Sequence, residues 1–562
     1  MLNFIIGRNN SGKTEKIRAL IAERASENKK CILIVPEQFS FESERSILEK
    51  IGAQKMLNVD ILSFTRLAFV INEQYGKALN KTIDDGTRKV LMSLSLEALS
   101  GKLEYFKRFS SKPALLSNLL TFVTELKQCA VTPDEIAEIS GKTGNKSLGK
   151  KLSELSLIAA SYDALVSRSF FDDENLLTIA ADMISETDFF DGKAVYFDAF
   201  CGFTKQERNC IKSILPKAEN VFISLCTDRD LSREGVSVFE NVNSEFSHLK
   251  KCAAEQNVGV SSPEILNVKE DGRSPELVYL EKYLCGEESE PYKEECDNIV
   301  VCAAGNRADE ADFVACEIKK LLRCNPTLRC RNIAVIERTA GTYDKELSES
   351  FKKYGVPMFE DKRRPIGIQP VMVFVKCLLA LCAEGFSTES FMRLLKTGLT
   401  ALSGDEISEL ENYAFLWNID GSKWRRDFTE NPDGLGFDVT EKSQEKLIRL
   451  NDIRKRSVLP VLAFKKDFEE ADGEKKSRLI YEFLIKNGVT ERLREKIEYL
   501  VSSGDTVLCE EQDTVWATLM DMLGKMASAI GETVITAKRY CELFNILLSA
   551  VTLGSLPQGV AR

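Results

Sequence analysis

Short apolar runs alternate with stretches of helical periodicity over the first 80 residues of the chain. Each apolar run is four or five residues long, which is typical of a strand buried in a parallel sheet. The runs are "LNFII" (2–6), "CILIV" (31–35) and "VDIL" (59–62). The helical stretches cover about 13–27 and 39–50 and continue from residue 64. This alternation predicts an α/β domain with a parallel sheet.

The pattern changes at about residue 84, where a long region of helical periodicity begins. Strand-like runs return at "AVYFDAF" (194–200) and "NVFISLC" (220–226). We therefore expect one α/β domain made of residues 1–80 and 190–290, interrupted by a helical insertion at 81–189.

A second α/β unit is predicted to begin at about residue 297. Its strands would be "NIVVCAA" (298–304) and "NIAVIE" (332–337), with "YGVPMFED" (354–361) turning into a third. We place the start of this second domain at 297–370 and a second helical insertion at 371–550. The last stretch, 551–562, would be a truncated return to the second α/β domain.

Bulk composition indicates an ordinary globular protein, with 44% hydrophobic and 29% charged residues. No apolar run approaches the roughly 18 residues that span a bilayer, and the N-terminus does not resemble a signal peptide. We expect a cytoplasmic protein with no membrane contact. The net charge of −10 argues against a general nucleic-acid coat, but it leaves room for a local basic channel. Candidate basic patches are Lys362 to Arg364, Arg425 and Arg426 beside Trp424, and Arg454 to Arg456, although such a patch is more often a solvated face than a phosphate contact.

The sixteen cysteines are scattered, and no CxxC pair occurs. Reduced, buried thiols explain them better than a disulfide framework or a metal site. The single histidine, His248, argues against a histidine-based metal site and against a Ser-His triad.

"GRNNSGKT" has the spacing of a phosphate-binding loop, and it stands between a predicted strand and a predicted helix. Backbone N–H groups of such a turn, with the following helix N-terminus, cradle phosphates. Lys13 would reach the β- and γ-phosphates of ATP, and the Thr14 hydroxyl would ligate Mg²⁺. The predicted nucleotide-binding residues are Gly7, Arg8, Asn9, Asn10, Ser11, Gly12, Lys13 and Thr14.

Hydrolysis needs a strand-end Asp for Mg²⁺ and a neighbouring acid that orients water. Asp198 ends the run "AVYFD" and is the candidate Mg²⁺ ligand, although a turn or cap role also fits it. Ala199 follows where an active motor would carry Glu, and Glu207 is expected in the next helix. We therefore predict nucleotide binding with slow or absent hydrolysis, and we assign no catalytic residue.

Two further segments, 36–44 and 63–69, follow predicted strands and combine aromatic with hydrogen-bonding side chains. Loops at the carboxyl ends of parallel strands line binding crevices. Aromatic rings stack on bases, and Arg contacts phosphate or a guanine edge. The candidate DNA-binding residues here are Gln38, Ser40, Phe64, Arg66 and Phe69. Helix-face core packing explains the Phe residues equally well.

Several stretches together resemble the AddB subunit of the bacterial AddAB helicase–nuclease. They are "GRNNSGKT", "LIVPEQFSFESE", "ILSFTRLAF", "VYFDAFCGFTKQE", "NIAVIER", "YGVPMFEDKRRPI", "ELENYAFLWNIDG" and "GSLPQG". The resemblance implies P-loop (RecA-like) domains of the superfamily 1 helicase type with large all-helical insertions. It also implies a subunit that joins an AddA-like partner in a heterodimer, binds single- and double-stranded DNA, and serves double-strand-break repair by homologous recombination.

In such a complex AddA supplies the motor, while AddB is an inactivated helicase fold that scans single-stranded DNA for the regulatory sequence Chi. The five loop residues carry over to that role, and Phe203 is added from the loop after Asp198.

Family members continue beyond the length of this chain into a nuclease domain flanked by cysteines that hold an iron–sulfur cluster. We expect this chain to lack both the B-side nuclease and the cluster ligands, as a fragment or as a truncated product. An independently active P-loop ATPase or DNA helicase is the alternative function.

Overall fold

The computed structural model describes residues 1–562 except 77–82, 108–111, 170–172, 228–237, 268–272, 284–289, 361–363, 505 and 554–562. The stretch "GSLPQG" and the basic patch at 362–364 fall outside the residues whose side chains are described. Contacts divide the chain into two compact units. The first is Met1–Val268 with Pro365–Thr552, and the second is Lys269–Arg364 with Leu553–Arg562.

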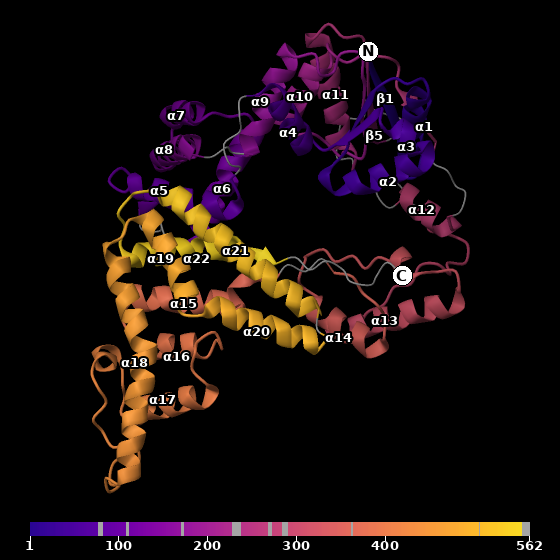
Figure 1. Cartoon of the computed structure of the whole chain (residues 1–562). Helices are drawn as coiled ribbons and strands as arrows, with labels where there is room; N and C mark the ends of the chain where they lie inside the picture. Colours follow the sequence, from indigo (N-terminus) through magenta and orange to yellow (C-terminus); the bar gives the residue numbers. More distant parts are fainter. Residues whose placement is uncertain are drawn as a thin grey trace. The chain divides into compact units, whose positions relative to one another are not determined.

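A six-stranded sheet lies in the first unit, and its paired strands are parallel (Figure 1). Its order is β3-β2-β4-β5-β1-β6. The strands are β1 (Leu2–Gly7), β2 (Cys31–Ile34), β3 (Val59–Leu62), β4 (Ala194–Phe197), β5 (Asn220–Cys226) and β6 (Glu264–Ile265). The predicted parallel α/β sheet is confirmed.

Both faces of the sheet are buried, because successive side chains of each strand point to opposite sides. On β1, Phe4 and Ile6 belong to one core and Ile5 belongs to the other. The Ile5 side is covered by α1 (Lys13–Ser26) and α2 (Ser40–Ile51). The other side is covered by helices α4 (Phe64–Tyr75), α9 (Asp173–Glu186), α10 (Lys205–Ile214) and α11 (Glu240–Glu255). Strands that are covered on both faces need apolar side chains at nearly every position, which explains their continuous apolar runs.

Helices fill the described chain between α4 and β4. They are α5 (Asp85–Ala98), α6 (Pro113–Gln128), α7 (Pro133–Lys142), α8 (Lys146–Ser169) and α9. Local signals define several starts: Asp84 caps α5 by accepting from the Thr87 N–H, and Thr132 with Glu135 forms a capping box on α7. None of the helices in the described residues is long and apolar enough to cross a membrane.

A second group of helices belongs to the same unit although it is remote in sequence. These are α15 (Pro370–Ala383), α16 (Thr388–Leu395), α17 (Gly404–Leu416), α18 (Glu441–Glu470), α19 (Gly473–Lys486), α20 (Val489–Ser502), α21 (Thr506–Ile530) and α22 (Ala537–Ala550). Helix α22 lies against α5 (Figure 1). Lys525 donates to Asp84 at 2.7 Å, and Arg539 donates to Glu97 at 2.9 Å. The sequence pattern assigned these helices to the second domain, but their contacts join them to the first insertion. The proposed domain boundaries themselves stay predictions.

The second unit packs α13 (Arg307–Cys324) against α14 (Asp344–Tyr354) around Ile318, Phe351 and Val356. Its other described α-helix is α12 (Pro275–Tyr283). The two short strands β7 (Arg364–Pro365) and β8 (Thr552–Leu553) stand where the chain passes from one unit to the other. The segments 298–304 and 332–337 form no strand in the described structure, which differs from the prediction. Val301 is 93% exposed and Ile336 is 90% exposed. A segment forms a strand only when its backbone N–H and C=O groups pair with a neighbouring segment. An apolar sequence pattern favours a strand but does not supply that neighbour.

Candidate nucleotide site and neighbouring edge loops

The predicted phosphate loop connects β1 to α1 in a turn that favours glycine at Gly7 and at Gly12. A Cβ on Gly7 would lie 2.3 Å from the Ser11 Oγ and 2.8 Å from the Leu266 carbonyl oxygen. Gly12 has φ 86°, and Asn10 has φ 58°, so both occupy the left-handed region. The spacing of the motif therefore has a direct steric cause.

Lys13 lies at the start of α1, and its ammonium is bound by the loop itself. Its Nζ donates to the Gly7 carbonyl at 2.8 Å and to the Arg8 carbonyl at 2.7 Å. No side chain caps the N-terminus of α1. The N–H groups of the first helical turn are therefore left for another acceptor, which is the arrangement that binds phosphate.

The cavity beside the loop has a volume of about 320 Å³. The loop from Asn9 to Glu15 forms one wall, and Asp198 to Cys201 form another. Both Thr14 and Asp198 line it, so hydroxyl and carboxylate oxygens, the atoms that Mg²⁺ prefers, face one space. The residues present thus fit a Mg²⁺–nucleotide.

Asp198 is 5% exposed and accepts a 2.5 Å hydrogen bond from the Ser224 hydroxyl. Ser224 belongs to β5, which separates β4 from the loop strand β1. The sequence analysis missed Ser224, although a hydroxyl inside the apolar run "NVFISLC" is a usable signal. It also missed Glu15, an exposed carboxylate in the first turn of α1 that lines the cavity.

No carboxylate follows Asp198 directly, because the next residue is Ala199. Ala199 is exposed and has φ 64°, a strained value for a residue with a Cβ. Glu207 lies in α10, where its carboxylate accepts from the Thr204 N–H at 2.7 Å in a capping box. Glu207 is thereby held at a helix start and does not line the cavity.

The two loops predicted to contact DNA lie side by side at the same sheet edge. β2 and β3 are parallel neighbours, so the segments that follow them emerge together. Gln38 is exposed in the short helix η1 (Glu37–Phe39), and the Arg66 guanidinium lies 3.6 Å from the Glu44 carboxylate. The Ser40 hydroxyl is buried without a hydrogen-bond partner in the described structure. This edge therefore combines exposed polar groups with one unsatisfied hydroxyl.

Comparison with known proteins identifies the family. The model described as "ADDB, N-terminal" matches residues 4–281. Proteins named as subunits of an ATP-dependent helicase/deoxyribonuclease match along the whole chain. This chain belongs to the AddB family.

The AddB relative from Acetivibrio thermocellus is 29% identical over 99% of this chain and 49% of its own length. Those from Clostridium acetobutylicum and Clostridioides difficile are each 28% identical over 100% of this chain and 49% of their own length. The chain spans about half the length of the curated AddB relatives it matches.

The aromatic residues singled out in this AddB sequence differ in their surroundings. Phe64 is 6% exposed and Phe203 is 7% exposed, and their ring centroids lie 6.1 Å apart in the core with Phe197 and Phe200. Phe69 is half-buried against the same core. Phe64 and Phe203 are therefore core residues in this fold. Their contact with DNA stays a prediction.

Phe41 is 77% exposed in the same edge segment as Gln38. It was not among the candidate DNA-binding residues predicted from the sequence. Its place within 36–44, among the loop residues shared with the AddB family, could have indicated it.

The basic patches predicted at 424–426 and 454–456 are partly structural. Trp424 is fully buried and donates to Thr388 at 2.9 Å. Arg454 is buried, donates to the Trp424 carbonyl at 3.0 Å, and pairs with Asp427. Arg425 and Arg426 remain exposed on η5 (Gly421–Arg425) and just after it.

The described cysteines are free thiols, as predicted, but they are only partly buried. Burial raises the pKa of the Cys210 thiol and of the Cys382 thiol to about 12, which keeps both protonated and unreactive. Cys129, Cys201, Cys296, Cys302, Cys316 and Cys324 are exposed, which corrects the expectation of buried thiols. Among the residues described, no three His, Cys, Asp or Glu side chains group as metal ligands.

Proposed function

We propose that this chain is the DNA-binding and nucleotide-binding subunit of a helicase–nuclease complex that processes double-strand DNA breaks for homologous recombination. Its relatives are named as one subunit of an ATP-dependent helicase/deoxyribonuclease, which implies a companion subunit. An AddA-like protein would be that companion and would supply the motor.

One observation carries the proposal: the phosphate loop and the exposed polar loops occupy the same edge of one sheet. β1 ends in the loop with Lys13, while β2 and β3 lead to Gln38 and Arg66. Parallel strands deliver all of these segments to their common carboxyl edge. A nucleotide at one part of the edge and a DNA strand at another would then be coupled through a single rigid sheet.

Lys13 and the uncapped start of α1 would bind the phosphates, and Thr14 with Asp198 would hold Mg²⁺. When bound, Mg²⁺ neutralises phosphate charge at this edge. Lys13 would have to exchange the Gly7 and Arg8 carbonyls for phosphate oxygens. This exchange gives the loop two states and makes its conformation depend on nucleotide.

We infer slow or absent hydrolysis because no acid directly follows Asp198 in the chain. Ala199 has no carboxylate, and Glu207 is occupied in a capping box. We infer that the chain holds ATP and scans single-stranded DNA, including the Chi sequence, with little turnover.

Glu15 favours the alternative of an independently active ATPase, since its carboxylate lines the cavity and is exposed. ATP turnover measured with and without single-stranded DNA separates the two. A turnover that DNA stimulates strongly and that Glu15→Gln abolishes would establish the alternative.

Binding to single-stranded oligonucleotides tests the scanning role. A random-sequence pool would be selected on the chain alone and with its companion subunit, and the preferred sequence would then be compared with scrambled versions. Arg66→Ala should cost about 1–3 kcal/mol at one base if Arg66 reads that base, and should weaken all sequences alike if it contacts phosphate. Arg45→Ala is the matched control, because Arg45 is exposed on α2 and pairs with Glu49. No sequence preference in the complex, or an unchanged preference in Arg66→Ala, would count against scanning.

A further inference from the structure

Two free thiols, Cys201 and Cys226, line the cavity that the phosphate loop forms. Cys201 is exposed in the segment that follows Asp198, and Cys226 is half-buried at the last position of β5. Neither thiol has a part in the proposed binding of phosphate or Mg²⁺, and both can be reached by solvent. The cavity therefore holds two nucleophilic side chains beside the groups proposed to bind a nucleotide.

The pairing of the strands places Cys226 beside the start of the phosphate loop. β5 runs parallel to β1, and Cys226 pairs with Gly7, the first residue of the loop. Side chains alternate along a strand, so Cys226 points to the same face of the sheet as Ser224, two positions before it. Ser224 donates to Asp198 on that face, which helix α1 covers. The Cys226 thiol therefore faces the space between the loop and Asp198.

The backbone around Cys226 is anchored on both sides. Ser224, before it, is bonded to Asp198 on the β4 side of the sheet. Thr227, after it, is fully buried, and its hydroxyl donates to the Asn243 side chain of α11 at 2.6 Å. Because the end of β5 is tied to two neighbouring elements, a group attached to the Cys226 sulfur has to be accommodated within the cavity. That cavity has a volume of about 320 Å³, which the phosphates also need.

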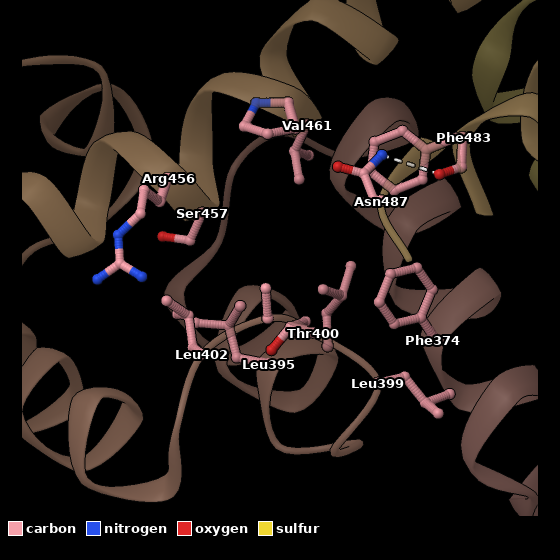
Figure 2. A pocket seen from close by; sticks show the side chains of 13 residues that line it. Phe374, Leu395, Leu399, Thr400, Leu402, Arg456, Ser457, Val461, Phe483 and Asn487 are labelled. Atoms are coloured by element: carbon pink, nitrogen blue, oxygen red, sulfur yellow. Dashed lines mark hydrogen bonds between the residues drawn. The ribbon is translucent and has the colours of Figure 1, made fainter. Parts of the chain in front are cut away.

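The surroundings of these thiols differ from those of other cysteines and cavities in the described residues. Burial raises the pKa of the Cys31 thiol on β2 to about 11, which keeps it protonated. Cys129 is exposed at the end of α6 and does not line the nucleotide cavity. A separate cavity among α15, α16, α18 and α19, whose lining side chains are drawn in Figure 2, has no cysteine among its described lining residues. Accessible thiols beside the phosphate loop are thus specific to Cys201 and Cys226.

We propose that Cys201 and Cys226 are modification sites for low-molecular-weight disulfides, and that the modified cavity excludes the nucleotide. This inference rests on the proposed nucleotide-binding function. A group attached to either sulfur would fill the space between the loop and Asp198. A bound nucleotide would in turn cover both thiols, so nucleotide and disulfide would compete for one cavity.

The reaction is a thiol–disulfide exchange, and glutathione disulfide is a suitable reagent. The cysteine thiolate attacks one sulfur of the reagent, a new S–S bond to the protein forms, and the S–S bond of the reagent breaks. One glutathione leaves as a thiolate, which takes up a proton in place of the one that the cysteine released. The reagent itself is reduced as the cysteine is oxidised, so no further oxidant is needed.

Treatment of the reduced full chain with glutathione disulfide, with and without Mg²⁺–ATP, tests the proposal. Mass spectrometry of peptides gives the rate of modification at each cysteine. Saturating Mg²⁺–ATP should slow the modification of Cys201 and Cys226 about tenfold or more, and that of Cys129 by less than about twofold, because exchange depends on access to the thiol. Modification of Cys129 with neither cavity thiol modified, or ATP binding that does not slow the cavity thiols, would overturn the proposal.

Binding of a fluorescent ATP analogue before and after treatment completes the test. The modified wild-type chain should bind about tenfold more weakly than the reduced chain, because the attached group clashes with the nucleotide, and dithiothreitol should restore binding. The double variant Cys201→Ser/Cys226→Ser should keep its own untreated affinity after treatment. The matched control Cys129→Ser should lose binding as the wild type does.

The two proposals fail in different ways. An equal loss of binding in the treated double variant, or full binding by the modified wild type, overturns the thiol site alone. Absence of binding in the reduced wild-type chain overturns the proposed nucleotide-binding function, and the thiol inference with it.

Discussion

The Ser224 hydroxyl donates to the Asp198 carboxylate across two neighbouring strands, at 2.5 Å. Asp198 is nearly buried, and Ser224 is 3% exposed, so the pair is shielded from solvent. Ser224 therefore orients the carboxylate that faces the loop across the nucleotide cavity.

Ser224→Ala should lower the free energy of unfolding by about 2 kcal/mol, because it leaves a buried carboxylate oxygen without its donor. It should also reduce the Mg²⁺ dependence of nucleotide binding. Urea unfolding and binding of a fluorescent ATP analogue at varied Mg²⁺ measure the two effects. The control is Ser247→Ala, since the Ser247 hydroxyl donates to the Asn243 carbonyl of its own helix and has no role at Asp198 in the described structure. Equal behaviour of the two variants would contradict the orienting role.

Lys13→Ala should weaken binding of the same ATP analogue about 10- to 100-fold, which is the range for a hydrogen bond to a charged group. Lys16→Ala removes a lysine one turn further along α1, where it pairs with Glu264 and does not line the cavity. That control should bind nucleotide like the wild type. Matching affinities for Lys13→Ala and wild type would remove the basis for the nucleotide site.

Gly7→Ala should distort the loop, because its methyl group would meet both Ser11 and the Leu266 carbonyl. We expect a loss of about 1–3 kcal/mol of stability together with weaker nucleotide binding. Gly101→Ala is the comparison, since a Cβ at Gly101 meets nothing within 4 Å. Thermal unfolding with and without ATP separates the variants, and an unaffected Gly7→Ala chain would show that the loop adapts.

Asp84 connects the cap of α5 to Lys525 on α21. Burial raises the pKa of its carboxyl, but hydrogen bonds from Lys525 and Thr87 outweigh burial and hold that pKa below its usual value. Its stabilising effect is complete above the unfolded-state pKa of about 4 and is lost as pH falls through the lower folded-state pKa.

Asp84→Asn should therefore cost about 0.5–1 kcal/mol at pH 7, since Asn still caps the helix, and the cost should shrink below about pH 4. Melting temperatures from pH 7 to pH 3.5 measure this. Asp521→Asn is the control, because Asp521 is an exposed partner of the same lysine. A constant difference between Asp84→Asn and wild type at every pH would refute the assignment.

Phe41 and Phe64 should respond oppositely to truncation. Phe64→Ala should lower stability by about 3–5 kcal/mol, as for a buried aromatic residue. Phe41→Ala should change stability by less than about 0.5 kcal/mol, yet weaken single-stranded DNA binding by about 1–3 kcal/mol if a base stacks there. Unfolding and oligonucleotide titration of both variants check this. Normal DNA binding by Phe41→Ala would remove Phe41 from the contact surface.

Local sequence determined the features that depend on neighbours in the chain. Three short apolar runs of the first 80 residues became parallel strands, because a buried strand needs continuous apolar side chains. The glycines of "GRNNSGKT" specify a turn whose steric demands are local, so this loop is recognisable without the fold. Membership of the AddB family followed from the same stretches.

Tertiary structure decided everything that depends on distant partners. Ser224 faces Asp198 only because β5 lies between β4 and β1. Phe64 and Phe203 became core, whereas Phe41 stayed exposed, and all three are equally apolar in sequence. Lys525 and Asp84 stand 441 positions apart, and no local pattern can signal their ion pair. An apolar side chain favours burial and a charged side chain favours an ionic partner. Which residues surround each of them is determined only by the packing of the fold.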